Sequence, residues 1–205
     1  QDKTVRPQTS LYYGPKYSEN QLRSTVKSVE NNYNTYVGNA KSVAELLSEN
    51  KIVAMYQGSS EAGPRALGNR SILYNPTDPN GKDFVNEVKG REWFRPFAGT
   101  VLEEDANKYF DLGGMKSSPF MMYAVDVKTL YPMQDHDPVP SITHVDNTCR
   151  VQTVNKDQNE NYYNIINEFK KLTGIPIVFN TSFNLAGEPL VETINDAINV
   201  LLNSD

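Results

Sequence analysis

The sequence predicts an α/β domain with a twisted, mixed β-sheet flanked by helices. Short β-rich apolar runs alternate loosely along the chain with segments whose apolar residues recur at helical spacing. The chain has 205 residues, of which 38% are hydrophobic, enough to bury a core without disulfides or metals. No internal repeat or low-complexity linker divides it, so we expect residues 1–205 to form one domain.

The first part of the chain leads from an arm into the sheet. We expect residues 1–35 to form an extended, linker-like N-terminal arm, in which 20–35 can form a polar helix. Ser42 and Glu45 have the spacing of a capping box, which predicts a helix that runs to residue 50. Short apolar runs then predict strands over 51–58 and 71–76.

The remaining elements continue this alternation. Gly90 and Gly174 are typical stops after amphipathic helices, and Thr193 is a typical N-cap. These signals predict helices over 82–90, 161–174 and 193–202. The β-rich runs predict strands over 119–127 and 175–180, whereas residues 129–149, with both histidines, are expected to form a loop.

The composition excludes several classes of partner and compartment. A net charge of −5 is unfavourable for nonspecific nucleic-acid binding, which needs a basic face. No run approaches the roughly 18 apolar residues of a membrane span. Cys149 is the single cysteine, so no internal disulfide can form, which fits a cytoplasmic protein.

Four polar loops carry the residues that chemistry would need. Five of the seven arginines fall in three of these loops, and guanidinium groups suit bidentate capture of phosphate or carboxylate. In an acidic chain, this concentration predicts a local pocket for more than one phosphate-like group. The loops are GPRALGNRS with Arg65 and Arg70, KGREWFRPF with Lys89, Arg91 and Arg95, THVDNTCRVQT with His144, Asp146 and Arg150, and FNTSFNLAGEP with Asn180, Ser182 and Asn184.

Structural alternatives exist for the charged and aromatic candidates. Either arginine of the first loop can bridge to carboxylates or cap a helix; we expect Arg65 to contact a ligand and Arg70 to brace the loop. The aromatic residues of the second loop, Trp93, Phe94 and Phe97, favour the core over a base-stacking platform.

The histidines and the cysteine also have structural interpretations. His144 beside Asp146 is a weak metal pattern, so a hydrogen-bonded loop histidine is the favoured interpretation and no metal ligand is assigned. His136 is expected to face solvent. Cys149 lacks the pairing pattern of a nucleophile and is expected to be a buried small residue.

Taken together, the motifs GPRALGNRSIL, REWFRPFA, ITHVD, RVQTV and NTSFN resemble the C-terminal domain of carbamoyltransferases of the NodU type. The resemblance covers nearly the whole chain. It implies a YrdC-like α/β fold, and a separate N-terminal domain of the actin-like ATPase superfamily that transfers the carbamoyl group to a hydroxyl. Nothing in these 205 residues resembles that metal-bearing domain, and there is no initiator methionine, so we expect a piece of a longer protein.

The resemblance also implies an activity for this chain. Such domains form carbamoyl-adenylate from carbamoyl phosphate and ATP, with Mg²⁺ accompanying ATP. Lys89-Gly90-Arg91 and Ser182-Phe183-Asn184 match the Lys-x-Arg and Ser-x-Asn signature of YrdC-type domains, which implies catalytic roles for Lys89, Arg91 and Ser182. The residues then expected to bind substrate or nucleotide are Arg65, Arg95, His144, Arg150, Asn180 and Asn184.

Two further functions compete with this prediction. The domain could bind nucleotide or carbamoyl phosphate without turnover, or act like a threonylcarbamoyl-adenylate synthase, which the acidic balance disfavours. The sequence departs from the family pattern at Ala62, Asn147 and Cys149, which affects local loop geometry rather than the reaction class. The expected partners are small-molecule substrates and the N-terminal transferase domain, with neither nucleic acid nor membrane.

Overall fold

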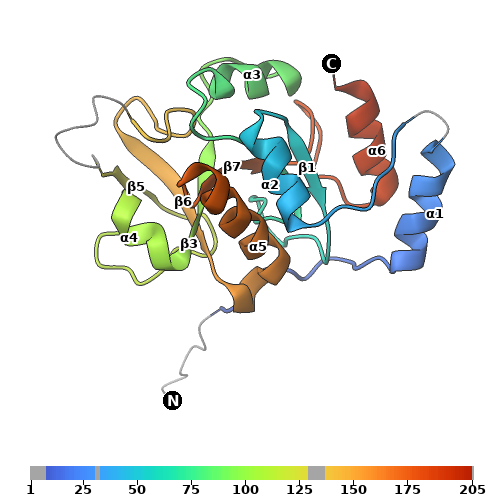
Figure 1. Cartoon of the computed structure of the whole chain (residues 1–205), viewed down its shortest axis with the longest axis horizontal. Helices are drawn as coiled ribbons and strands as arrows, with labels where there is room; N and C mark the ends of the chain where they lie inside the picture. The colour runs from blue at the N-terminus through green and yellow to red at the C-terminus, as the bar shows by residue number, and fades with distance from the viewer. Residues whose placement is uncertain (1–7, 31–32, 129–136, 205) are drawn as a thin grey trace.

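A mixed β-sheet forms the centre of the molecule (Figure 1). The structure is a computed structural model that describes residues 8–30, 33–128 and 137–204. Within these ranges the sheet has seven strands in the order β1-β2-β7-β3-β6-β5-β4, and β3 and β6 are parallel while the other neighbours are antiparallel. The strands are β1 Val53–Tyr56, β2 Arg70–Tyr74, β3 Ala98–Leu102, β4 Phe110–Asp111, β5 Ala124–Val127, β6 Thr148–Val154 and β7 Ile177–Ser182.

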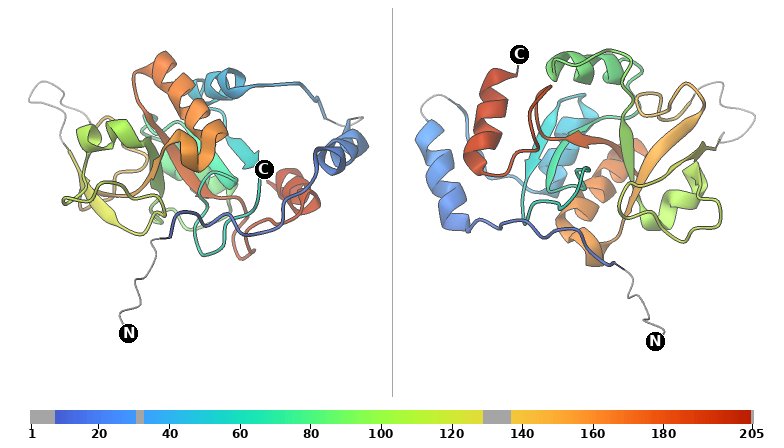
Figure 2. Two further views of the ribbon diagram at one scale, coloured as in Figure 1. Left: turned by 90° about the horizontal axis from the view of Figure 1, so that it is seen from below. Right: turned by 180° about the vertical axis from the view of Figure 1, so that it is seen from behind.

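Helices cover both faces of the sheet, so the predicted α/β class with a mixed, helix-flanked sheet is confirmed (Figure 2). Adjacent strand residues point to opposite faces, and β2 shows which helix covers which face. Leu73 packs with α2 and α5, whereas Ile72 packs with α6 on the other side. The helices are α1 Glu19–Val29, α2 Ala40–Ser48, α3 Gly81–Val88, α4 Ala106–Tyr109, α5 Lys156–Thr173 and α6 Ile194–Asn203, with a short 3₁₀ turn over Glu103–Asp105.

Helix α5 follows its sequence pattern closely. Helical spacing predicts an apolar face for this helix, and Tyr162, Ile165, Ile166 and Phe169 are buried against the sheet and α2. Leu172, which has the same spacing, is 48% exposed. Each such burial stabilises the fold by roughly 1.5–3 kcal/mol. Gly174 ends the helix with a φ of 78°, a left-handed conformation that glycine adopts without a Cβ penalty.

Two helix starts test the capping predictions. Thr193 caps α6 in a reciprocal capping box with Asp196, as expected. At α2 the expected box between Ser42 and Glu45 is wrong by one turn. Asn39 is the N-cap and Ser42 is the N3 residue that closes the box, because an asparagine side chain caps as well as serine.

The segment 129–149 is only partly a loop. Strand β6 begins at Thr148, which the sequence analysis placed in this loop, so β6 was missed along with β3 and β4. Strand β6 lies between β3 and β5 and is buried along most of its length, which a polar sequence such as Thr-Cys-Arg-Val-Gln-Thr does not reveal. Residues 129–136, with His136, lie outside the described residues.

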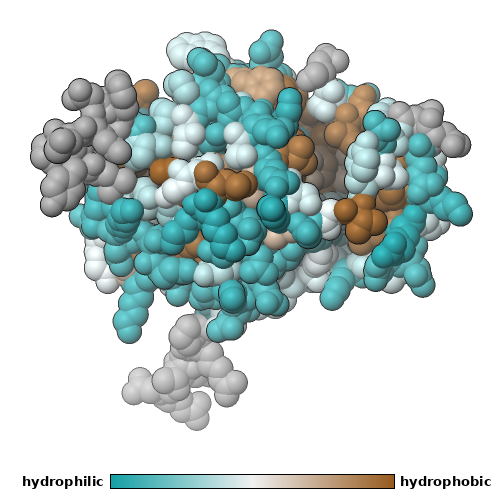
Figure 3. Space-filling model, in the orientation of Figure 1, coloured by the Kyte–Doolittle hydropathy of each residue, from teal (hydrophilic) through white to brown (hydrophobic). Residues whose placement is uncertain are grey.

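The N-terminal arm contains the polar helix expected within 20–35, which is α1. Residues 8–17 run along the domain. The Tyr12 hydroxyl donates to the Leu67 carbonyl at 2.9 Å, and the backbone of Lys16 forms an isolated antiparallel β-bridge with Ser59. Helix α1 then packs beside α6 (Figure 1). On the face shown in Figure 3 the surface is mostly hydrophilic, and hydrophobic residues form small separate groups.

Candidate anion-binding site

The site is built on one end of three neighbouring central strands, β7, β3 and β6. Ala98, at the start of β3, pairs with Asn180 of β7 on one side and with Arg150 of β6 on the other. Directly paired residues of adjacent strands point to the same face. The strand register therefore places the Asn180 amide and the Arg150 guanidinium on one face, either side of the small Ala98.

The loop between β1 and β2 passes over this end of the strands and carries Arg65. It is held by the buried carboxylate of Glu61, whose Oε1 accepts from the backbone N–H groups of Leu67 at 2.7 Å and Asn69 at 2.8 Å. Gly68 allows the loop to lie flat, because its φ is 108° and an added Cβ would stand 2.2 Å from the Tyr162 ring. Sequence reasoning missed Glu61, although its position at the head of a glycine-rich loop was a signal.

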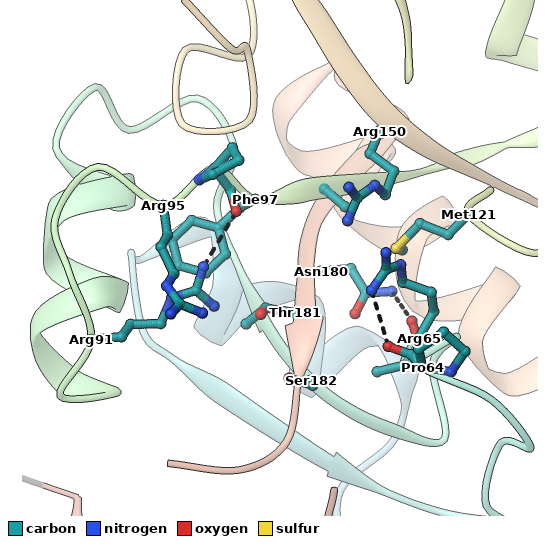
Figure 4. A pocket seen from close by; sticks show the side chains of 13 residues that line it. Pro64, Arg65, Arg91, Arg95, Phe97, Met121, Arg150, Asn180, Thr181 and Ser182 are labelled. Atoms are coloured by element: carbon teal, nitrogen blue, oxygen red, sulfur yellow. Dashed lines mark hydrogen bonds between the residues drawn. The ribbon is translucent and has the colours of Figure 1, made fainter. Parts of the chain in front are cut away.

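The two arginines of this loop have different environments. Arg70 is fully buried, and its guanidinium donates to the carbonyls of Gln57 at 2.6 Å and Asn69 at 3.0 Å. It also stacks over the Tyr56 ring at 3.8 Å. Arg70 therefore braces the loop, while Arg65 hydrogen-bonds only the carbonyl of Pro64 among described residues and points into a pocket (Figure 4).

That pocket has a volume of about 320 Å³ and is rich in arginine. Figure 4 shows Arg65 and Arg150 on one side, the first wall, and Arg91 and Arg95 on the other, the second wall. None of the described residues that line it is Asp or Glu. The lining is completed by Pro64, Ala66, Pro96, Phe97, Ala98, Met121, Asn180, Thr181 and Ser182.

The arginines are partly desolvated and repel one another. Burial and then the charge of Arg65 lower the pKa of Arg150, and burial and then the charge of Arg95 lower the pKa of Arg91. Arg91 lies over the Phe97 ring at 4.5 Å, whereas Arg95 is half exposed and forms a 2.7 Å ion pair with Glu92. A bound anion would relieve this crowding of like charges.

A second pocket of about 460 Å³ adjoins the first and shares Arg91, Arg95 and Ser182 with it. Its inner wall holds Lys89, which is almost fully buried. The Lys89 ammonium donates to the carbonyls of Ser182 and Asn184, the latter at 2.7 Å, and to the Asn184 side chain at 3.1 Å.

Lys89 consequently fixes the Ser-x-Asn segment that follows β7. The Ser182 hydroxyl donates to Asn184 Oδ1 at 2.6 Å, so the two signature segments form one hydrogen-bonded unit. Burial, and secondly the charge of Arg91, lowers the pKa of Lys89 to about 7. Its charge therefore changes near neutral pH.

His144 is the one predicted site residue that the described structure keeps away from both pockets. Its ring nitrogens contact the Thr148 hydroxyl at 3.1 Å and the Phe97 carbonyl at 2.9 Å. It lines a separate hollow of about 210 Å³ with Phe94. The alternative of a hydrogen-bonded loop histidine fits these contacts, because both ring nitrogens are already engaged.

The remaining candidates divide between core and surface. Cys149 is fully buried, and burial raises the pKa of its thiol to about 12, so it is inert as a nucleophile. Phe97 is in the core as expected, but Trp93 and Phe94 are mostly exposed, and the expectation that they are core residues is wrong. They follow the end of α3, where the chain runs over the surface beside the second wall.

The part of the chain that the structure describes contains no group of three or more His, Cys, Asp or Glu side chains arranged to hold a metal ion. Within the same residues, no helix has both the length and the apolar character that crossing a bilayer requires.

Comparison with known proteins shows which family the sequence matches. The model of the family described as carbamoyltransferase C-terminus matches residues 44–205. The chain is 45% identical over 168 residues to the nodulation protein NolNO of Sinorhizobium fredii and to NolO of Bradyrhizobium diazoefficiens. These alignments cover 81% of this chain but 24% and 30% of the relatives, so the chain spans about a quarter to a third of their length.

Solved structures share the fold. A full-length HypF in a phosphate- and nucleotide-bound form matches with a TM-score of 0.55 and 20% identity, covering 83% of this chain and 20% of that one. HypF of T. kodakarensis matches with a TM-score of 0.54 and 16% identity, covering 80% and 20% respectively. The likeness confirms the YrdC-like α/β fold expected from the sequence.

Proposed function

This chain belongs to the carbamoyltransferase C-terminus family, and we propose that it forms carbamoyl-adenylate from carbamoyl phosphate and ATP. The activity of the whole enzyme, an ATP-dependent O-carbamoyltransferase, would then need the part of the relatives that this chain does not span. The acceptor hydroxyl would be bound there, by an N-terminal domain of the same polypeptide.

One observation carries the proposal. Four arginines line a pocket whose described lining includes no carboxylate, and two of them, Arg91 and Arg95, also line the adjoining pocket. Carbamoyl phosphate and ATP are both highly charged, and their repulsion must be offset before they can react. Two adjoining cationic pockets with a common wall would hold both anions and bring their reacting groups together. A nucleotide-binding role also agrees with the HypF relative that was solved with phosphate and nucleotide bound.

The proposed reaction has two balanced steps. Water attacks carbamoyl phosphate, the bond between the carbamoyl group and the phosphate breaks, and inorganic phosphate leaves with carbamate remaining. A carbamate oxygen then attacks the α-phosphorus of ATP, forming the mixed anhydride while the bond to the β-phosphate breaks and pyrophosphate leaves. Both steps develop negative charge on phosphate oxygens, which preorganised guanidinium and hydroxyl donors stabilise.

The predicted residues take distinct roles in this scheme. Arg65, Arg150 and Arg91 would bind phosphate oxygens directly. Ser182 lies at the junction of the two pockets, and its hydroxyl would turn from Asn184 Oδ1 to donate to a phosphate oxygen when the anion binds. Lys89 would add positive charge and position Ser182 through the Asn184 side chain. Asn184 would thus act mainly by holding the serine hydroxyl.

Mg²⁺ is expected to arrive with ATP. The described residues provide no carboxylate cluster for a metal, so the nucleotide phosphates themselves would have to supply most of the ligands. No step of the scheme depends on a metal site in this chain. The protein is proposed to act in the cytoplasm, where both substrates are available.

The test is pyrophosphate release from ATP by the 205-residue chain, measured with and without carbamoyl phosphate. We expect release that depends on carbamoyl phosphate and falls at least about a hundredfold in Lys89→Ala and Ser182→Ala. Lys41→Ala on α2 and Ser24→Ala on α1, both at exposed positions, are the matched controls and should keep full activity.

The other outcomes favour the alternatives. ATP binding without pyrophosphate release would mean a binding module that is idle without its partner domain. Release that requires threonine and bicarbonate, and not carbamoyl phosphate, would favour a threonylcarbamoyl-adenylate synthase-like activity.

A further inference from the structure

The side-chain amide of Asn180, at the floor of the arginine pocket, has a fixed orientation. Its Nδ2 faces three acceptors with two N–H groups, the Ala66 carbonyl at 3.2 Å, the Thr100 hydroxyl at 3.0 Å and Gln152 Oε1 at 3.2 Å, so one N–H is shared. The Ala66 carbonyl can only accept, so the nitrogen must face it. Gln152 is oriented in turn, because its own nitrogen donates to the Leu67 carbonyl at 3.0 Å.

This orientation leaves Asn180 Oδ1 without a partner. The side chain is 1% exposed, and Oδ1 has no hydrogen bond in the described structure. A buried acceptor without a donor is costly, which makes such an atom in a pocket floor a candidate for ligand contact. Figure 4 shows the Asn180 side chain between the two walls of the pocket, beside Thr181.

The chemistry around Oδ1 restricts what it can bind. The four charged side chains of the pocket are arginines, which donate and cannot accept. A phosphate oxygen would be repelled by Oδ1 and attracted by the arginines. The group that belongs at Oδ1 is therefore a hydrogen-bond donor on a ligand whose other end is anionic.

Building on the proposed function, we propose that Asn180 Oδ1 accepts a hydrogen bond from the amide N–H of the carbamoyl group and so selects carbamoyl phosphate over acyl phosphates. The phosphate would bind the arginine walls while the NH₂ group faces the floor. An acetyl group has the same shape but presents a methyl group, which leaves Oδ1 buried and unpaired. Asn180 is thereby a specificity-determining residue that acts as a hydrogen-bond acceptor.

Two stable probes separate the amide from the phosphate. Phosphonoacetamide carries an NH₂ group and acetonylphosphonate carries a methyl group at the same position, and both end in a phosphonate. By calorimetry we expect the 205-residue chain to bind phosphonoacetamide on the order of tenfold to a hundredfold more tightly than acetonylphosphonate. In Asn180→Ala this ratio should fall to about one, while the affinity for inorganic phosphate changes by less than about threefold.

A control distinguishes recognition from general damage to the network. Thr100→Val removes two hydrogen bonds of the same buried network, to Gln152 and to Asn180, without removing Oδ1, so it should lower stability and keep the preference for the amide. A ratio near one in the unaltered chain, or a ratio that survives in Asn180→Ala, would overturn the inference while leaving phosphate binding intact. If Asn180→Ala does not fold, Asn180→Ser and the ratio in the unaltered chain decide the question. An unaltered chain that binds neither probe nor phosphate would overturn the proposed function, and this inference with it.

Discussion

The two walls of the arginine pocket are built differently. The first wall, Arg65 and Arg150, is attached to a loop held by Glu61 and to the buried strand β6. The second wall, Arg91 and Arg95, belongs to a surface segment after α3. There the support comes from the Phe97 ring under Arg91 and from the exposed ion pair of Arg95 with Glu92.

The two walls should therefore respond differently to substitution. Buried hydrogen bonds hold the first wall, so its guanidinium positions depend on the stability of the fold. The second wall is held by one contact of Arg91 with the buried Phe97 ring and by the exposed ion pair of Arg95, and exposed ion pairs contribute little to stability. Variants that remove buried support should therefore have large effects, and variants of the exposed ion pair should have small ones.

The largest effect is expected behind the first wall, from Arg70→Met. This change leaves the carbonyls of Gln57, Gly58 and Asn69 without their buried donor and should lower the free energy of unfolding by about 3 kcal/mol. Urea denaturation measures it. Arg65→Met is the matched control in the same loop and should change stability by less than about 0.5 kcal/mol. Equal losses in the two variants would contradict the difference between bracing and ligand-facing arginines.

Anion binding by the first wall should depend strongly on Arg150. Arg150→Gln removes a partly desolvated donor, and we expect sulfate affinity to fall about tenfold because charge-assisted hydrogen bonds contribute roughly 1.5–3 kcal/mol. Calorimetric titration with sulfate is the measurement. Arg23→Gln, on the exposed face of α1, is the control for lost net charge. An equal fall in that variant would point to general electrostatics rather than a site.

A smaller effect is expected with pH in the pocket beside the second wall. Lys89 has a pKa lowered to about 7, so it loses its proton, and the pocket loses a positive charge, as the pH rises through 7. Sulfate keeps its own charge between pH 6 and 8.5, and its affinity should fall a few-fold over this range. Lys89→Met should abolish this dependence, whereas His144→Gln, in the separate hollow, should retain it. A dependence that persists in Lys89→Met would assign the titration to another group.

The smallest effect is expected from the exposed ion pair. Glu92→Gln releases Arg95 toward the pocket and should strengthen sulfate binding less than about threefold, with stability changed by less than about 0.5 kcal/mol. The same two measurements detect both changes, and raising the salt concentration should diminish the gain. A stability loss above 1 kcal/mol would show that the second wall is held as firmly as the first.

Local patterns predicted much of the fold and most of the candidate residues that line the two pockets. The apolar spacing of α5, the glycine after it and the cap of α6 are short-range signals that need no tertiary partner. The clustered arginines indicated an anion pocket, because guanidinium groups bind phosphate and carboxylate through paired hydrogen bonds. Every predicted site residue except His144 lines one of the two adjoining pockets.

Short-range patterns therefore predicted the fold class, the family motifs, the residue types of the pocket and a bracing role for Arg70. In contrast, that Glu61 holds the arginine loop and that Asn180 Oδ1 lacks a partner among the described residues became evident only from the folded arrangement. The physical reason is that these features depend on which atoms from distant segments form hydrogen bonds with each buried polar group. Strand register and burial determine those partners, and a local pattern of residues specifies neither.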